Sequence, residues 1–141
     1  MSKNKTKLII TTPQGYFFND DVEIVTLKTT EGYIGIQKDS QSLIASIKPS
    51  KLFINQINSK DLKICAISGG IAFIDKNEIK IITDAIEFKE DIDLERAKKG
   101  KEIIEQKLKK PNLSKSKIEE YNLKIEKANN RINVKNNSDT F

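Results

Sequence analysis

Short runs of alternating apolar and polar residues fill the chain up to about residue 84. Apolar side chains recur at every second position, and clusters of Gly, Pro, Asn and Asp separate the runs. Many short strands at intervals of roughly 8–12 residues predict a β-sandwich or a barrel. The predicted strands are Lys7–Thr12, Tyr16–Phe18, Val22–Thr29, Tyr33–Ile36, Leu43–Ile47, Leu52–Ile57, Leu62–Ile67, Ile71–Asp75 and Ile79–Thr83.

Clusters of turn-forming residues mark several of the predicted strand boundaries. Asn19-Asp20-Asp21 is expected to close the second strand, because these residues favour turns. Lys48-Pro49-Ser50 and Ser68-Gly69-Gly70 are expected to be turns between successive strands. The many isoleucines agree with strands, since β-branched side chains fit a pleated, half-buried surface.

After Phe88 the apolar positions follow a helical period. Asp91-Ile92-Asp93 supplies carboxylates for a helix start, and Pro111-Asn112 predicts its end. Apolar residues of this first helix share one face, namely Leu94, Ala97, Ile104 and Leu108. Ser116–Glu119 has the S-x-x-E pattern of a capping box and predicts the start of a second helix. Its apolar stripe consists of Ile118, Tyr121, Ile125, Ala128 and Ile132.

Two amphipathic helices joined by a short polar loop predict an antiparallel hairpin. The fold class is therefore a β-sandwich followed by an α-helical hairpin. The expected division is a β-sandwich domain over residues 1–88, a two-helix hairpin over 89–134 and a disordered tail over 135–141.

Composition removes several classes of function. The chain has no His and a single Cys65, so an internal disulfide, the usual zinc sites and every His-based catalytic triad are excluded. Paired carboxylates such as Asp20-Asp21 and Glu119-Glu120 have the character of turn and helix-surface groups. We therefore expect a protein that is not an enzyme, with no metal and no cofactor.

No signal peptide and no spanning helix is expected, because no apolar run approaches 18 residues. These features predict a cytoplasmic protein without direct membrane insertion. The net charge of +5 is uneven: residues 1–88 hold 11 Lys and Arg against 10 Asp and Glu, and residues 89–141 hold 14 against 10. The basic character belongs to the helices.

Four segments resemble, in order, those of the epsilon subunits of F-type ATP synthases and ATPases. Glu31–Ile36 is similar to their E-G-x-x-G-[IV] segment, and Ile47-Lys48-Pro49 to their [LI]-K-P turn. Ile67–Ile71 resembles their S-G-G turn, and Thr83-Asp84-Ala85 the end of their sandwich. The resemblance covers roughly residues 7–134, and Gly turns of this kind would also serve other sandwiches.

The resemblance implies a rotor subunit of the central stalk. The sandwich would bind the γ subunit, and the hairpin would swing out to press on the α/β catalytic head and inhibit ATP hydrolysis. The complex would sit on the cytoplasmic face of the cell membrane, with the membrane rotor ring as a further partner. The family usually has a Pro-Gly-His-Ala-Pro-like loop where this chain has residues 37–42. That departure leaves open a specialised hydrolytic ATPase without an ordinary ring.

A nucleotide site is the further implication. Epsilon subunits of one bacterial group bind ATP through an [IL]-D-x-x-R-A motif, which Ile92–Ala97 matches, and through basic residues on the second helix. The candidate nucleotide-binding residues are Glu87, Asp93, Arg96, Ala97, Lys127 and Arg131. ATP would be a weak ligand there, with cations facing its phosphates.

Two other interpretations remain open. In the first, there is no nucleotide site: Asp93 only caps the first helix, and Arg96 pairs with a residue across the hairpin. A small basic nucleic-acid-binding module is the alternative from another class, given the pI of about 9.2. Only two arginines occur and no basic–aromatic interleaving lines a strand face, so nucleic acid is not an expected partner.

Overall fold

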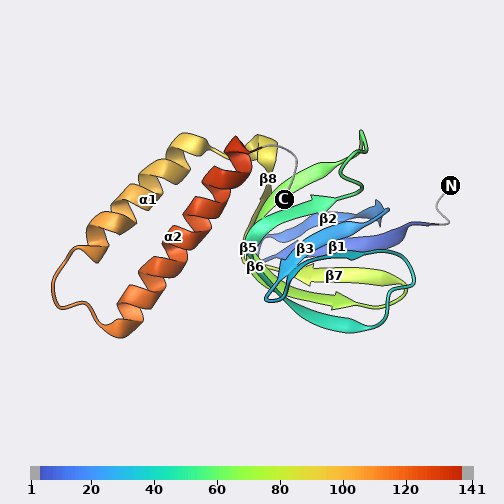
Figure 1. The fold of residues 1–141 in the computed structure, drawn as a ribbon, viewed down its shortest axis with the longest axis horizontal. Helices are drawn as coiled ribbons and strands as arrows, with labels where there is room; N and C mark the ends of the chain where they lie inside the picture. The colour runs from blue at the N-terminus through green and yellow to red at the C-terminus, as the bar shows by residue number, and fades with distance from the viewer. Residues whose placement is uncertain (1–3, 138–141) are drawn as a thin grey trace.

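A computed structural model of the 141-residue chain describes residues 4–137. Eight strands come first, and two helices follow them (Figure 1). The strands are β1 (Thr6–Thr12), β2 (Gly15–Val22), β3 (Val25–Thr29), β4 (Gly32–Ile36), β5 (Leu43–Ile54), β6 (Lys63–Ile74), β7 (Glu78–Ile82) and β8 (Ile86–Phe88). A 3₁₀ turn, η1 (Lys89–Asp91), leads to helices α1 (Leu94–Leu108) and α2 (Lys115–Asn136).

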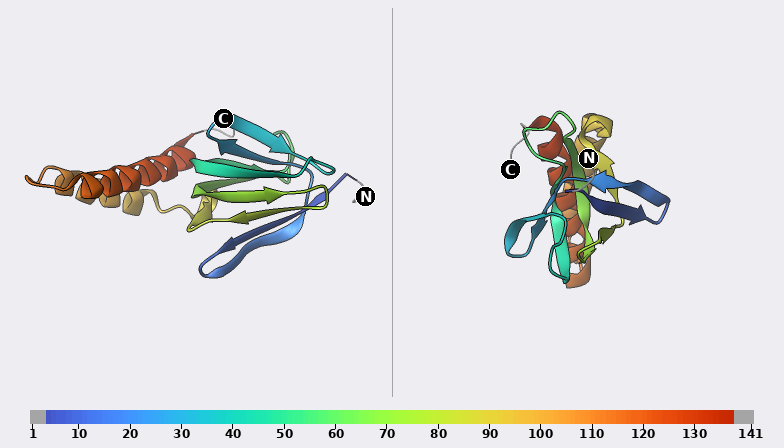
Figure 2. Two further views of the ribbon diagram at one scale, coloured as in Figure 1. Left: turned by 90° about the horizontal axis from the view of Figure 1, so that it is seen from below. Right: turned by 90° about the vertical axis from the view of Figure 1, so that its right-hand side faces the viewer.

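The strands form one connected sheet in the order β2-β1-β7-β6-β5-β3-β4. Strand β8 pairs with the part of β6 that does not pair with β7. The sheet folds over a core of mostly Ile, Leu and Val. Fully buried members of this core are Leu8, Ile10, Val22, Val25, Leu27, Leu52, Ile54, Cys65, Ile67, Ala72, Ile79 and Ile81. The hairpin extends from one end of the strands (Figure 2). The predicted fold class, a β-sandwich followed by a helical hairpin, is confirmed.

The predicted turns at Lys48–Ser50 and Ser68–Gly70 are wrong. Both clusters lie inside long strands, and Pro49 faces Ser68 in an unbroken β5–β6 register. The pair bends there instead of turning. Before the bend, β6 pairs with β8 on its other side, and after the bend it pairs with β7.

Backbone geometry explains why Gly stands at the bend. Gly69 and Gly70 have φ of +103° and +149°, values that side chains with a Cβ rarely adopt. A Cβ on Gly70 would also collide with the carbonyl oxygen of Ile82 on β7. The buried hydroxyl of Thr83 contacts the Gly69 carbonyl and so ties the bend to the end of β7.

Two further strand predictions are wrong. Asn19, Asp20 and Asp21 do not end a strand but continue β2 as far as Val22. Their side chains are exposed on an edge strand, where polar residues cost little and charges discourage pairing with other chains. The predicted strand over Val22–Thr29 is two strands, because the chain turns a corner between them. Asn55 holds that corner by accepting from the Glu23 amide at 2.9 Å.

The two helices lie antiparallel, as expected (Figure 1). Asp93 caps α1 by accepting a hydrogen bond from the Arg96 amide at 3.1 Å. The predicted capping box at Ser116 is wrong, because Ser114 caps α2 through the Lys117 amide at 3.1 Å. None of the helices within residues 4–137 is long and apolar enough to cross a membrane.

The end of α2 lies beyond the boundary predicted at residue 134. Lys135 and Asn136, which the composition assigned to a disordered tail, belong to the helix. The reason is tertiary: Val134 is fully buried against the sandwich and Lys135 bonds to backbone carbonyls. Residues 138–141 of the expected tail lie outside the described residues.

We predict that Gly70→Ala lowers the free energy of unfolding by more than about 1 kcal/mol, since the new Cβ meets both an unfavourable φ and the Ile82 carbonyl. Gly100→Ala is the matched control: it lies in α1 with open space around it and should raise stability by about 0.5–1 kcal/mol. Denaturant unfolding of both variants measures this. Equal stability of Gly70→Ala and the parent protein would contradict the role given to the bend.

Candidate functional site at the junction of hairpin and sandwich

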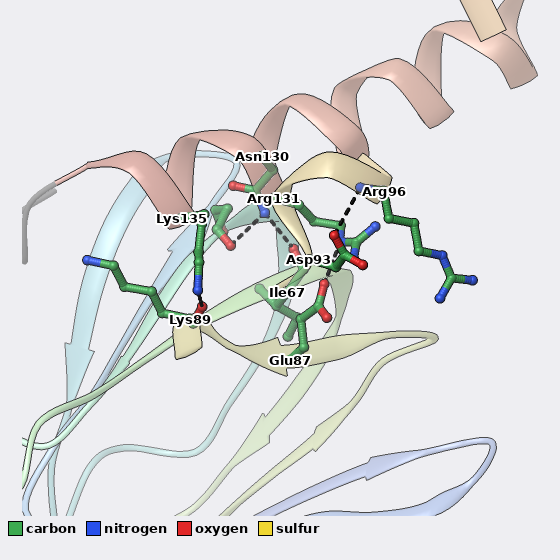
Figure 3. A network of polar contacts seen from close by, with 9 residues as sticks. Ile67, Glu87, Lys89, Asp93, Arg96, Asn130, Arg131 and Lys135 are labelled. Carbon is green, nitrogen blue, oxygen red and sulfur yellow. Dashed lines mark hydrogen bonds and ion pairs between the residues drawn. The ribbon is translucent and has the colours of Figure 1, made fainter. Parts of the chain in front are cut away.

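Helix α2 lies across β5 and β6 at their bend. The side-chain amide of Asn130 donates to the carbonyl oxygens of Ser50 and Ile67, at 2.9 and 3.2 Å (Figure 3). Ser50 and Ile67 are direct partners across the β5–β6 pair, so one amide bridges two strands. A buried carbonyl without a partner costs about as much as a lost hydrogen bond. Asn130 therefore fixes the position of α2 on the sheet.

One turn further along α2 the contact becomes apolar. Val134 is fully buried in a cluster that also contains Phe53, Ile64, Ala66 and Ile92. Phe53, Ile64 and Ala66 alternate with core residues along β5 and β6, so their side chains cover the opposite face of the sheet. The end of α2 covers this second, small core.

Two lysines close the junction at the C-terminal end of α2. The Lys135 ammonium donates to the carbonyl oxygens of Lys89 and Glu90, at 3.1 and 3.3 Å. The Lys89 ammonium donates in turn to the Asn137 carbonyl at 2.9 Å. A cation near the C-terminus of a helix also interacts favourably with the helix dipole. These bonds fasten α2 to η1.

The predicted residue Glu87, on β8, forms an ion pair with the predicted residue Arg131, on α2 (Figure 3). Their side chains are 29% and 33% exposed, so the pair is partly desolvated. It is a second direct link between the sandwich and the hairpin. The sequence placed both residues at the site but did not predict that they pair.

Asp93 and Ala97 have structural roles in the described chain. The Asp93 carboxylate is used in capping α1, as the simpler interpretation expected. Ala97 is 2% exposed at the contact between α1 and α2, where a small side chain lets the helices approach. Asp93 and Ala97 also line the groove between α1 and α2.

Arg96 and Lys127 complete the candidate set. Within residues 4–137 the Arg96 guanidinium makes no ion pair, so the expected pairing across the hairpin is not seen there. Its side chain points away from the Glu87–Arg131 pair (Figure 3). Arg96, Lys127 and Arg131 nevertheless line the same groove between α1 and α2. Lys99 and Lys124 line it as well, so five cationic side chains and the carboxylates Asp93 and Glu95 border this groove.

That groove has a volume of about 760 Å³, within the roughly 300–1,000 Å³ of ligand sites. A smaller hollow of about 320 Å³ continues toward the sheet, and Glu87, Arg96, Lys127 and Arg131 all line it. Ser68 lies in its wall, and the Ser68 hydroxyl is buried with no hydrogen-bond partner in the described part of the chain. A buried hydroxyl of this kind is a donor for a bound water or ligand.

The groove and the hollow together are lined by more cations than carboxylates, since three carboxylates, Glu87, Asp93 and Glu95, stand against five cationic side chains. Among residues 4–137, no cluster of three Cys, Asp or Glu side chains could hold a metal ion.

Sequence reasoning missed Asn130 and Lys135 as docking residues. The apolar stripe gave no signal for Asn130, because residues two positions apart do not share a helix face and Asn130 lies on the opposite side of α2 from Ala128 and Ile132. No pattern marked Lys135, whose partners are backbone carbonyls distant in sequence.

At the end of the sandwich away from the hairpin, the loop 37–42 lies against the turn before β7 (Figure 1). The Asp39 amide donates to the Lys76 carbonyl at 3.2 Å, and Asp39 has φ of 65°. The Ser40 hydroxyl donates to the Gln37 carbonyl at 2.6 Å. These bonds order a loop that carries no proline.

Residues 5–89 match the family described as the beta-sandwich domain of the ATP synthase Delta/Epsilon chain. The chain is 46% identical to the ATP synthase epsilon chain of Mycoplasmopsis pulmonis, covering 94% of each. Identity is 40% to the epsilon chain of Mycoplasmopsis synoviae, covering 94% of this chain and 96% of that one. It is 36% to that of Ruminococcus albus, covering 92% and 96%.

Two solved structures share the fold. A chain of the Euglena gracilis mitochondrial ATP synthase superposes with a TM-score of 0.73 at 20% identity, over 89% of this chain and 78% of that one. A chain from the central stalk and c-ring of the Tetrahymena thermophila mitochondrial ATP synthase gives 0.64 at 15%, over 96% and 99%. With near full-length identity of up to 46% to bacterial relatives, the chain belongs to the family of ATP synthase epsilon chains.

Proposed function

We propose that the chain is a non-catalytic rotor subunit that binds the γ subunit and turns with the central stalk, on the cytoplasmic face of the cell membrane. The observation that carries this is the near full-length identity to bacterial epsilon chains. Its sandwich transmits torque without chemistry, and its hairpin regulates ATP hydrolysis by the α/β head.

An exposed apolar patch on β5, β6 and β7 supports the γ contact. Ile44 and Phe73 face each other across β5 and β6, and Ile71 faces Ile82 across β6 and β7. Their exposed fractions run from 39% for Phe73 to 69% for Ile44. Apolar side chains that gather on one exposed face mark a protein–protein contact. We assign this patch to γ.

Regulation by the hairpin is supported by the polar nature of its docking. Asn130, Arg131 and Lys135 hold α2 through hydrogen bonds and one ion pair, while Val134 is the fully buried apolar side chain of the helix. Such contacts are replaced by water when the hairpin leaves, so release costs little beyond the burial of Val134. We propose that the docked hairpin permits hydrolysis and the released hairpin inhibits it.

ATP is the ligand we propose for the groove between α1 and α2. Arg96, Lys127 and Arg131 would face the phosphates, and Asp93 or the Ser68 hydroxyl would contact the nucleoside. The smaller hollow shares Arg96, Lys127 and Arg131 with this groove and is also lined by Glu87 of β8, so ATP that reaches it would favour the docked hairpin.

One observation favours a second candidate, a specialised hydrolytic ATPase of the same lineage without an ordinary rotor ring. The loop 37–42 has no proline and is tied down by Asp39 and Ser40 instead. In this candidate the far end of the sandwich would not contact a membrane ring. Purification of the intact complex, with its subunits identified, distinguishes the two: a ring subunit in the complex excludes the second candidate.

We predict that Ile44→Asp lowers recovery of the γ subunit with this chain at least tenfold, because a charge would be buried in the interface without a partner. Leu123→Asp is the control, since Leu123 is also exposed, at 46%, but lies on α2 outside the patch. Co-purification of the complex measures the effect. Equal recovery of γ with both variants would show that γ does not bind at this patch.

We predict opposite effects for loss and for release of the hairpin. Deletion of residues 89–141 should leave the complex assembled and raise its ATP hydrolysis rate. Asn130→Ala should lower the rate, because losing two hydrogen bonds and orphaning two carbonyls weakens docking by about 1–3 kcal/mol.

Asn129→Ala is the control for the hairpin prediction, as it removes the same side chain from the exposed neighbouring position. Steady-state hydrolysis by the purified complexes is the measurement. A rate that the deletion leaves unchanged would remove the inhibitory role. If Asn130→Ala raises the hydrolysis rate, the docked hairpin is the inhibitory state and the released hairpin is the permissive one.

We predict that the isolated chain binds ATP and that Arg96→Gln weakens this binding at least tenfold, since a hydrogen bond to a charged group contributes about 1.5–3 kcal/mol. Arg96 has no ion pair within residues 4–137, so the variant should keep the fold. Lys107→Gln, an exposed cation near the end of α1 outside the groove, is the control. Titration calorimetry decides: no heat of binding at several millimolar ATP excludes the site.

A further inference from the structure

The C-terminal end of α2 carries the contacts that hold the hairpin on the sandwich. The hydrogen bonds, the ion pair and the buried apolar side chain described above come from residues 130–136. At Lys135 the helix lies beside η1, because the Lys135 ammonium bonds to two backbone carbonyls of that turn. This part of α2 is therefore supported by the sandwich and by η1. Its docking residues are Asn130, Arg131, Val134 and Lys135.

The same seven residues form a helix although most of them favour other conformations. In a helix, β-branched side chains lose rotamer freedom, and Asn side chains compete by bonding to nearby backbone groups in non-helical conformations. In residues 115–129, by contrast, Lys, Glu, Leu and Ala fill nine of the fifteen positions. The end of α2 is thus the intrinsically weaker part of the helix. Its poor helix formers are Asn130, Ile132, Asn133, Val134 and Asn136.

Tertiary contacts compensate for this weakness. Most of the stability of a protein helix comes from packing rather than from propensity. When the hairpin leaves the sandwich, the Asn130 bonds, the Arg131 ion pair and the burial of Val134 are lost together. What then remains is the composition of residues 130–136, which disfavours the helix.

We propose that residues 130–136 are helical only while the hairpin is docked on the sandwich, and that they unwind when it is released. Unwinding presupposes the release proposed above and adds a change within α2 itself. The helix becomes shorter by seven residues, about 10 Å at roughly 1.5 Å per residue. Formation of these last two turns is part of docking, so their helix propensity helps to set how tightly the hairpin docks.

Carbon-13 NMR shifts of the full chain test the unwinding residue by residue. Ala66→Glu puts a carboxylate without a partner beneath Val134 and should release the hairpin, which loss of the nuclear Overhauser signal between Val134 and Phe53 reports. Helical Cα shifts should then persist over residues 115–129 and fall at least about threefold over residues 130–136. Helical shifts that persist over residues 130–136 after this signal is lost overturn the proposal.

Glu87→Lys is a second releasing variant, because it replaces the ion pair with Arg131 by repulsion on the partly exposed β8. It provides the same test should Ala66→Glu fail to fold. Ile44→Glu is the matched control: it adds a carboxylate to an exposed position of β5 and should leave the helical shifts of α2 unchanged. These experiments use the chain alone, so their outcome does not depend on whether the released hairpin inhibits hydrolysis.

Replacement of single asparagines tests the link between helix strength and docking. In the Glu87→Lys background, Asn133→Ala should raise the ratio of docked to released hairpin about threefold, because Ala favours the helix and only the docked state is helical there. Asn122→Ala is the matched control, since Asn122 is equally classed as exposed but lies in the part that is helical in both states. The Ala66 methyl shift, which senses the packing of α2, measures the ratio. Equal ratios in the two variants overturn the proposal.

Discussion

The shared bend of β5 and β6 is the constraint on which the rest of the structure depends. Without it the two long strands could pair only with one set of neighbours, and the sheet would not fold over its core. Gly69 and Gly70 allow the bend, and the collision that a Cβ would make with Ile82 shows how closely β7 follows it. The same bend presents the Ser50 and Ile67 carbonyls to α2. Closure of the sandwich and docking of the hairpin thus have one origin.

Docking of the hairpin rests on interactions of modest size. A protein hydrogen bond contributes about 0.5–1.5 kcal/mol net, and burial of one Val side chain about 1.5 kcal/mol. Ordering the side chains that make these contacts costs up to about 2 kcal/mol each, highest for Lys and Arg. These opposing terms are similar in size, so under the proposed regulation a partner surface could shift the balance between docked and released hairpin.

Much of the fold could be predicted from sequence because its signals are local. Alternation gave the strands near their observed places, and the change of period after Phe88 gave the hairpin. Local signals failed where contacts with residues distant in sequence determine the structure. Ser68-Gly69-Gly70 has the composition of a turn, yet β7 and β8 hold it within one strand. Likewise the motif placed Arg131 at the site, but its partner Glu87 comes from β8, and no pattern within α2 contains that information.

Arg131 belongs both to the contact between hairpin and sandwich and to the groove proposed for ATP. In the described structure its guanidinium is held by Glu87, and the same side chain lines the groove proposed for ATP. A phosphate that draws Arg131 away from Glu87 would exchange one link between hairpin and sandwich for another. ATP would then favour the docked hairpin over the released one by only a small free energy. A ligand at a concentration equal to its dissociation constant stabilises the bound state by only about 0.4 kcal/mol. If ATP binds the docked state more tightly, a residue that raises the docked population raises the apparent affinity for ATP until docking is complete. A nucleotide can therefore control this hairpin only if the docked and released states are nearly equal in free energy, which is the balance that a few polar contacts around one buried valine can produce.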